Sequence, residues 1–167
     1  MNPKVVYSVI SELCRKGVFS SNPENVLLER EGYPDIAPCG RSYGRDGLDL
    51  SQLEWAANVG HFWFLGPVKA IKIVIDRGLV QGDLRLEAEK MIFITSFNVF
   101  NYDDLNLVIK KLKQTGRQFG LKIEFQQNAM MPYQLILIIS SEKVLSTDNV
   151  NEFLKQIHML HQSTEGL

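Results

Sequence analysis

The C-terminal half of the chain has the clearest pattern of apolar and polar positions. Three short segments rich in β-branched and aromatic residues predict strands, at 91–97, 121–126 and 133–140. Apolar residues that recur every three or four positions predict amphipathic helices at 101–120 and from about Thr147 onward. This half of the chain therefore alternates between strand and helix.

The N-terminal half is less regular. Its pattern predicts a helix over 4–16, and a second helix that opens with Asn22 and Pro23 and ends near Gly32. A strand is expected at 33–38, and the aromatic run HFWFL at 61–65 is short enough for a buried strand.

Residues 66–77 predict a further helix. Val68, Ile71, Val74 and Ile75 fall on one side of it, and Gly78 follows where it would end. Strands that alternate with helices indicate an α/β protein with a mixed central β-sheet flanked by helices. We expect residues 1–167 to form a single domain of this class.

Composition restricts the partners. The chain has 167 residues with 45% apolar content, enough for a buried core, and its formal net charge is only −1. The molecule as a whole therefore does not attract nucleic acid, and any basic surface must be local. The two cysteines and three histidines are not spaced as zinc ligands, and the longest apolar runs are too short to cross a bilayer as helices. We expect a cytoplasmic protein with no membrane partner.

A glycine-rich segment with acids and arginines, PCGRSYGRDGLDL at 38–50, has no regular apolar period. Together with Gly32-Tyr33 before it, the sequence Asp46-Gly47-Leu48-Asp49 within it, and IFITS at 92–96, it resembles the restriction-endonuclease-like (PD-(D/E)xK, Mrr-type) nucleases. The resemblance covers about residues 23–126. It implies a restriction-endonuclease-like fold and metal-dependent hydrolysis of phosphodiesters.

The resemblance also implies site residues. Asp49 would be the catalytic acid that binds the metal, with Asp46 or Glu54 as an auxiliary acid, because carboxylates hold the Mg²⁺ that activates water. The family's next strand supplies Glu or Gln, one residue, and then Lys, whereas HFWFL at 61–65 has neither. With this lysine absent, two alternatives remain: a nuclease with a degenerate site, or a nucleic-acid-binding protein derived from one. Apart from Mg²⁺, no cofactor is expected.

Basic residues outside the acidic turn are candidates for phosphate contact. Lys110, Lys111 and Arg117 crowd one predicted helix, and Arg41 and Arg45 lie in the glycine-rich segment, where a guanidinium could grip a phosphate of DNA with two hydrogen bonds. Ordinary structural roles compete with each assignment. Asp-Gly is a strong turn former, and a run of lysines on a helix often marks only a solvated face.

Two other functions fit the same residues. Residues 66–77 could be the recognition helix of a winged-helix DNA-binding protein, with the segment after Gly78 as its wing. Alternatively the chain is a protein-interaction subunit of a larger assembly, with Phe62, Trp63 and Phe64 as exposed anchors, since large aromatic side chains often carry the binding energy of protein interfaces.

Overall fold

The computed structural model describes residues 1–15, 26–30, 33–36, 67–77 and 80–165. Along the chain these residues form the following elements: α1 (Pro3–Arg15), β1 (Val26–Arg30), β2 (Tyr33–Ile36), β3 (Val68–Arg77), β4 (Val80–Leu86), β5 (Met91–Asn98), a 3₁₀ helix (Val99–Asn101), α3 (Leu105–Gln118), β6 (Lys122–Gln127), β7 (Gln134–Ser141) and α4 (Thr147–Ser163).

The strands form one seven-stranded sheet with the order β2-β1-β3-β4-β5-β7-β6. Every pairing in this order is antiparallel, so the expectation of a mixed sheet was wrong for the described strands. The reason is connectivity. β4 and β5 are joined by a tight turn in which Glu87 N donates to Lys90 O at 2.8 Å, and β6 and β7 form a second hairpin. Links as short as these permit only antiparallel pairing.

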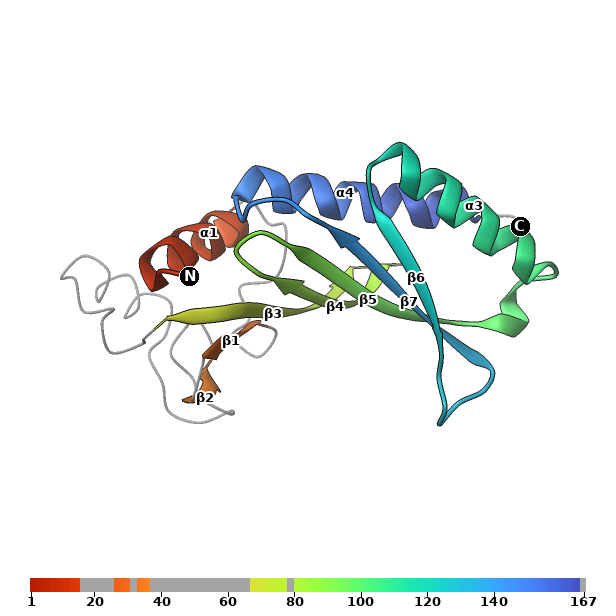
Figure 1. The fold of residues 1–167 in the computed structure, drawn as a ribbon, viewed down its shortest axis with the longest axis horizontal. Coiled ribbons are helices and arrows are strands. Elements are labelled where there is room, and N and C mark those ends of the chain that lie inside the picture. Colours follow the sequence, from red (N-terminus) through yellow and green to blue (C-terminus); the bar gives the residue numbers. More distant parts are fainter. Residues whose placement is uncertain (16–25, 31–32, 37–66, 78–79, 166–167) are drawn as a thin grey trace.

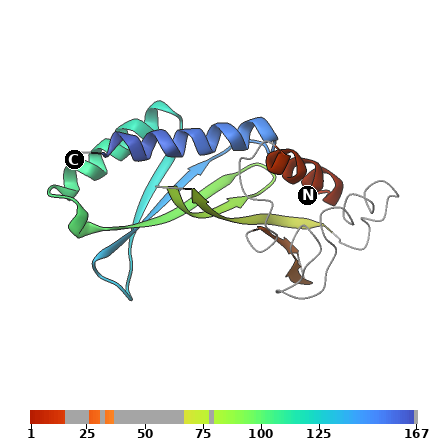
Figure 2. The same ribbon diagram turned by 180° about the vertical axis from the view of Figure 1, so that it is seen from behind.

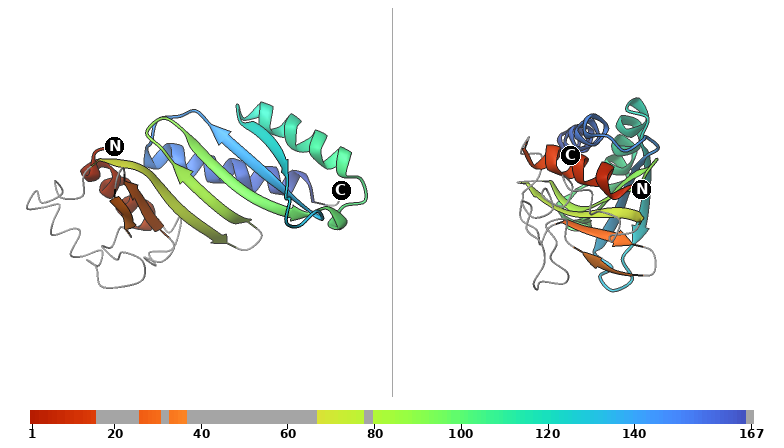
Figure 3. Two further views of the ribbon diagram at one scale, coloured as in Figure 1. Left: turned by 60° about the horizontal axis from the view of Figure 1, so that its bottom comes forward. Right: turned by 90° about the vertical axis from the view of Figure 1, so that its left-hand side faces the viewer.

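The three α-helices of the described residues lie on one face of the sheet (Figures 1 and 2). We call this the inner face and the opposite one the outer face. In the left view of Figure 3 the sheet lies in front of α4, and α3 lies next to β6. The expected flanking helices are therefore present, but the described ones cover a single face.

The core fills the space between the two layers. Alternate strand residues point to the inner face and are almost fully buried, among them Ile73, Leu84, Leu86, Met91, Phe93 and Ile139. Each helix adds a buried stripe at helical spacing, which in α4 consists of Val150, Phe153, Ile157 and Leu160. One continuous apolar cluster results, which supports the α/β class inferred from the sequence.

Two predicted helices are strands. Residues 66–77 contain β3, which pairs with β1 on one side and β4 on the other, and the helix expected after Pro23 contains β1 instead. β-branched residues make up much of β3, and such side chains pack well on a pleated surface. Because residues 66–77 are not a helix, the recognition helix of the winged-helix alternative was wrong. β4 was also missed, because the segment after Gly78 was considered only as the wing of that alternative.

The remaining predictions about elements that fall on described residues were confirmed, whereas the strand expected at 61–65 lies outside them. The helices near 4–16, 101–120 and Thr147 and the strands near 33–38, 91–97, 121–126 and 133–140 correspond to α1, α3, α4, β2, β5, β6 and β7. Side chains cap two of the helices: Asp104 accepts from Leu107 N and Ser146 accepts from Asn149 N, each at 3.1 Å. Across the described residues, each helix is too short or too polar to pass through a membrane.

Candidate nucleic-acid interface

Three of the five basic residues predicted to contact phosphate, Lys110, Lys111 and Arg117, lie on α3. Val108, Leu112 and Gly116, four residues apart, are the buried stripe of this helix. That spacing turns the cationic side chains outward, and Lys110, Lys111, Lys113 and Arg117 are all exposed. No acidic residue lies between Leu105 and Gln118, so α3 presents positive charge alone.

Most of these cations are free to take a new partner. Within the described part of the chain, no carboxylate forms an ion pair with Lys110, Lys111 or Arg117. Lys113 differs, because its ammonium lies over the ring of Phe125, 5.7 Å from the centroid. Exposed cations without acids nearby attract phosphate without first giving up a competing contact.

A shallow hollow lies where α3 turns into β6. It has a volume of about 450 Å³ and is lined by Lys113, Arg117, Gly120, Leu121, Lys122 and Ile123. Gly120 makes the reversal at a φ of 71°, in the left-handed region, and Leu121 N donates to Gly116 O at 2.8 Å. The turn therefore places Lys122 at the same hollow as Arg117.

The sequence did not single out Lys122. Its ammonium lies 3.0 Å from a carboxylate oxygen of Glu124, and both side chains are exposed, so the pair is weak. A lysine two residues after the glycine that follows a basic helix was the available signal. We define the basic surface as Lys110, Lys111, Lys113, Arg117 and Lys122.

The other predicted site residues lie outside the described residues. These are Asp46, Asp49 and Glu54 of the proposed metal site, Arg41 and Arg45 of the glycine-rich segment, and the aromatic residues Phe62, Trp63 and Phe64. The described residues themselves bring together no group of three or more His, Cys, Asp and Glu side chains that could hold a metal ion. The assignment of Asp49 as the Mg²⁺ ligand stays a prediction.

The outer face of the sheet is a second surface with a distinct composition. At its centre, β5 and β7 pair Ile94 with Ile138, flanked by Ile92 and Ile136 on the same face. The exposed fraction of Ile94 is 39%, and that of Val74 on β3 is 52%. Apolar side chains of this size that remain in contact with water mark a candidate docking surface.

Charged residues border these isoleucines in two adjacent rows across the strands. One row carries Lys72, Arg85 and Lys122, which we call the positive row. The next row carries Asp83 and Glu124, which we call the negative row. Arg85 also binds Glu29 at 2.5 Å and Glu87 at 3.5 Å, which holds its guanidinium in place.

Comparisons with known proteins add little to this description. No family model matches the chain, and no curated protein matches it. Among solved structures, YbjN from E. coli, described as a candidate transcription regulator, is 15% identical and aligns over 66% of this chain and 85% of its own, with a TM-score of 0.37. A likeness of this size carries no argument about the fold or the function of this chain.

Proposed function

We propose that this protein binds nucleic acid through the basic surface on α3 and β6. The observation that carries the proposal is that α3 presents four exposed cations with no acid among them, while the chain as a whole is slightly acidic. A local excess of positive charge is what binding to a phosphate backbone needs, and it is independent of base sequence. DNA is the expected partner.

The resemblance to restriction-endonuclease-like nucleases adds a finer hypothesis. In it, Asp49 binds Mg²⁺ and Asp46 or Glu54 assists in activating a water molecule. Residues 92–96, the IFITS segment, lie in β5 and are followed by α3, which agrees with the order that the resemblance implies. The missing lysine would make such an enzyme slow, since the loss of a preorganised contact to a developing anion commonly costs a hundredfold or more, on the order of 3 kcal/mol.

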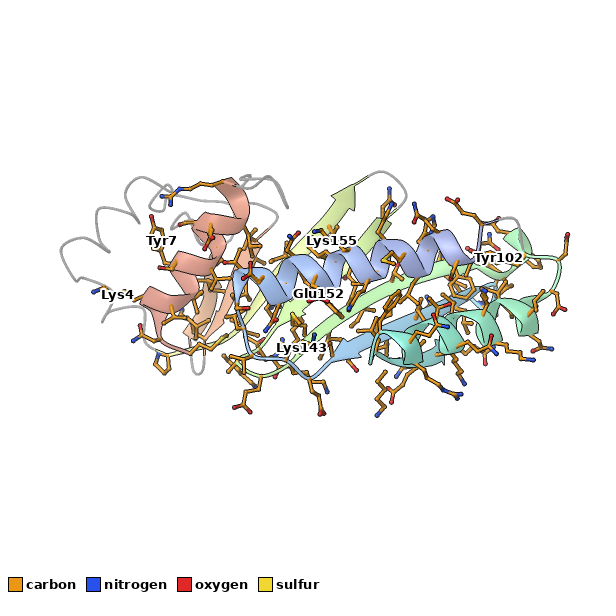
Figure 4. All side chains as sticks on the ribbon, turned by 90° about the horizontal axis from the view of Figure 1, so that it is seen from above. Lys4, Tyr7, Tyr102, Lys143, Glu152 and Lys155 are labelled. Atoms are coloured by element: carbon orange, nitrogen blue, oxygen red, sulfur yellow. The ribbon has the colours of Figure 1, made fainter. Side chains whose placement is uncertain are left out.

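A binding assay on duplex DNA tests the proposal. In the Lys110→Glu/Lys111→Glu variant, two phosphate contacts become repulsive, and we expect affinity at low salt to fall by at least about tenfold. The control is Lys4→Glu/Lys155→Glu, which changes the net charge equally at exposed positions on α1 and α4 (Figure 4). Equal losses in both variants would mean that only overall charge matters, and would contradict a local site.

Cleavage is measured in the same samples with Mg²⁺ or Mn²⁺. If the chain is a nuclease, Asp49→Ala abolishes cleavage while DNA binding persists. If no DNA is cut by the parent at any metal concentration, the nuclease hypothesis fails and the binding proposal still stands on the α3 variants.

The outer face of the sheet favours a second candidate function, protein interaction, and from its charge rows we infer a second copy of the chain as the partner. Consider a second copy whose sheet lies face to face on the first and is related to it by a rotation of 180°. If the rotation axis is parallel to both sheets, perpendicular to the strands and midway between the two rows, each positive row lies over a negative row of the other copy. The same rotation sets Ile92 over Ile94 of the second copy. Face-to-face sheets pack about 10 Å apart, so these side chains would meet.

Complementary charge changes test this second candidate in solution. The Asp83→Lys/Glu124→Lys variant carries two positive rows, and the Lys72→Glu/Arg85→Glu/Lys122→Glu variant carries two negative rows. Each variant alone should be monomeric by light scattering, whereas the mixture should form heterodimers because opposite rows face each other again. A parent that is monomeric at high concentration, or a mixture that stays monomeric, would rule out this interface.

A further inference from the structure

A cavity lies between the inner face of the sheet and the helices α3 and α4. Its volume is about 130 Å³. The sheet supplies its floor through Phe93, Leu137 and Ile139, and the helices cover it with other apolar residues, namely Val108 and Leu112 from α3 and Ile157 and Leu160 from α4. None of the residues of the basic surface lines it.

The apolar residues of the floor and of the two helices that line the cavity are almost fully buried. Phe93, Ile139 and Leu160 are each exposed by only 1%, and Val108 is as well. An apolar cavity of roughly 150 Å³ lined by such residues stays dry and accepts a molecule the size of benzene. The dimensions of this cavity therefore fit one aromatic ring.

One end of the cavity is polar. Tyr102 and His161 line it there, with Thr95 and Gln81 next to them. Figure 4 shows Tyr102 beside the C-terminal end of α4, where His161 lies. The ring of Tyr102 meets Phe97 edge to face, with 5.4 Å between the centroids, a contact that fixes the ring from the side.

Some of the polar groups at this end have a hydrogen-bond partner within the described part of the protein, and others have none there. Thr95 Oγ1 donates to Gln81 O at 2.6 Å, and Thr164 Oγ1 donates to His161 O at 2.8 Å. In the portion of the chain that the structure describes, neither the Tyr102 hydroxyl nor the His161 imidazole has a hydrogen-bond partner. Two half-buried groups that can each donate and accept thus remain unused at the mouth of an apolar cavity.

We propose that this cavity binds a small hydroxylated aromatic molecule, a monocyclic phenol, with the ring among the apolar side chains and the hydroxyl between Tyr102 and His161. A hydroxyl both donates and accepts, which matches these two partners. A carboxylate in the same place would lose part of its hydration, and among the residues that the structure describes no lysine or arginine lines the cavity to pair with it, so the neutral group is favoured. Pockets with an apolar body and a few convergent polar groups commonly bind small molecules.

Three probes of equal ring size test the proposal: toluene, p-cresol and p-toluate. Methyl NMR of the parent protein is the readout, with Ile139 and Leu160 in the cavity and Ile94 and Val74 on the outer face as remote controls. We expect p-cresol to shift the cavity methyls with an affinity at least equal to that of toluene, although its hydroxyl must leave water. We expect p-toluate to bind at least tenfold more weakly than p-cresol.

Variants that lack a single tyrosine hydroxyl distinguish specific binding at this site from non-specific partitioning of the probes into the protein. Tyr102→Phe keeps the ring and its contact with Phe97, and should weaken p-cresol by roughly 2- to 10-fold without changing toluene. Tyr133→Phe is the matched control, because Tyr133 is exposed on the β6–β7 hairpin and stacks on Phe100 away from the cavity. It should change neither affinity.

A filled cavity completes the test. Leu137→Phe replaces a side chain of the floor by a larger ring and should abolish binding of both toluene and p-cresol. The comparison made with Tyr102→Phe does not depend on how well the Leu137→Phe variant folds. The proposal is overturned if no probe shifts the cavity methyls at millimolar concentration. It is also overturned if Tyr102→Phe weakens toluene and p-cresol equally or leaves p-cresol unchanged.

Discussion

Replacement of Gly82 by alanine should destabilise the sheet. The size of the loss in stability can be estimated from the atoms around this glycine. A Cβ at Gly82 would lie 2.5 Å from the backbone oxygen of Ile94 and 2.6 Å from Cζ of Phe93. Both distances are far below ordinary van der Waals contact. Ile94 belongs to β5, which pairs with β4, and Phe93 is buried, so neither atom can move without disturbing the strand pairing or the core.

The expected cost follows from two opposing effects. Overpacking of a well-packed core typically costs about 1–3 kcal/mol, and alanine in a strand gains back roughly 0.5–1 kcal/mol of chain entropy. Because the clash involves backbone, we expect the upper part of this range, a net loss of about 2 kcal/mol in the free energy of unfolding. Urea denaturation followed by circular dichroism measures it as a lower midpoint at an unchanged slope.

Two other glycines serve as matched controls. At Gly116 the nearest atom to a new Cβ is Cδ1 of Ile123, the far end of a flexible side chain, and alanine favours the helix by about 1 kcal/mol, so Gly116→Ala should be nearly neutral. At Gly120 there is open space, but the positive φ would cost alanine about 1–2 kcal/mol. A Gly82→Ala protein as stable as the parent, or less affected than Gly116→Ala, would refute the packing of β4 against β5.

Further predictions concern the helices. Phe153→Ala, which empties a position that is 1% exposed in α4, should cost about 3–5 kcal/mol in thermal or chemical unfolding, whereas Met159→Ala on the same helix, 47% exposed, should cost under about 1 kcal/mol. Similar losses in both would contradict the orientation of α4. Ser146→Ala and Asp104→Ala each remove an N-cap and should cost about 0.5–2 kcal/mol, while Ser146→Asp should restore most of the loss; unchanged unfolding midpoints would show that the caps are not formed.

Helical periodicity succeeded where the sequence also carried helix boundaries. α3 was predicted from its apolar stripe, and Asp104 is its N-cap in the structure. α4 similarly begins near Thr147, as expected. In α3 the residues between the ends are mostly good helix formers, so local preference and tertiary packing agree.

The same periodicity failed over residues 66–77. Val68, Ile71, Val74 and Ile75 fit the spacing of a helix, yet the segment between two partner strands is extended. Short apolar runs are ambiguous between the two periods, and the β-branched residues in the segment were the better guide. Strand pairing is a long-range property, so neither the antiparallel order of the sheet nor its outer face could be obtained from the segment alone.

Only part of the candidate site was accessible from the sequence. The lysines of α3 were visible as a charge run, but the role of Lys122 depended on the turn at Gly120, which brings β6 back beside the helix. The cavity could not be foreseen, because Tyr102, Phe93 and His161 are far apart in the chain and meet only after the helices have packed. The strands and helices that carry its apolar residues were predicted from the sequence.

The salt dependence of DNA binding tests the central claim most directly. For the parent, log K should fall linearly with log salt concentration, with a slope of about −0.9 for each phosphate neutralised. In Lys110→Glu/Lys111→Glu the slope should be shallower by about 2, whereas Lys4→Glu/Lys155→Glu should leave it unchanged. A parent that does not bind duplex DNA at low salt, or a slope that is the same in all three proteins, would contradict the account.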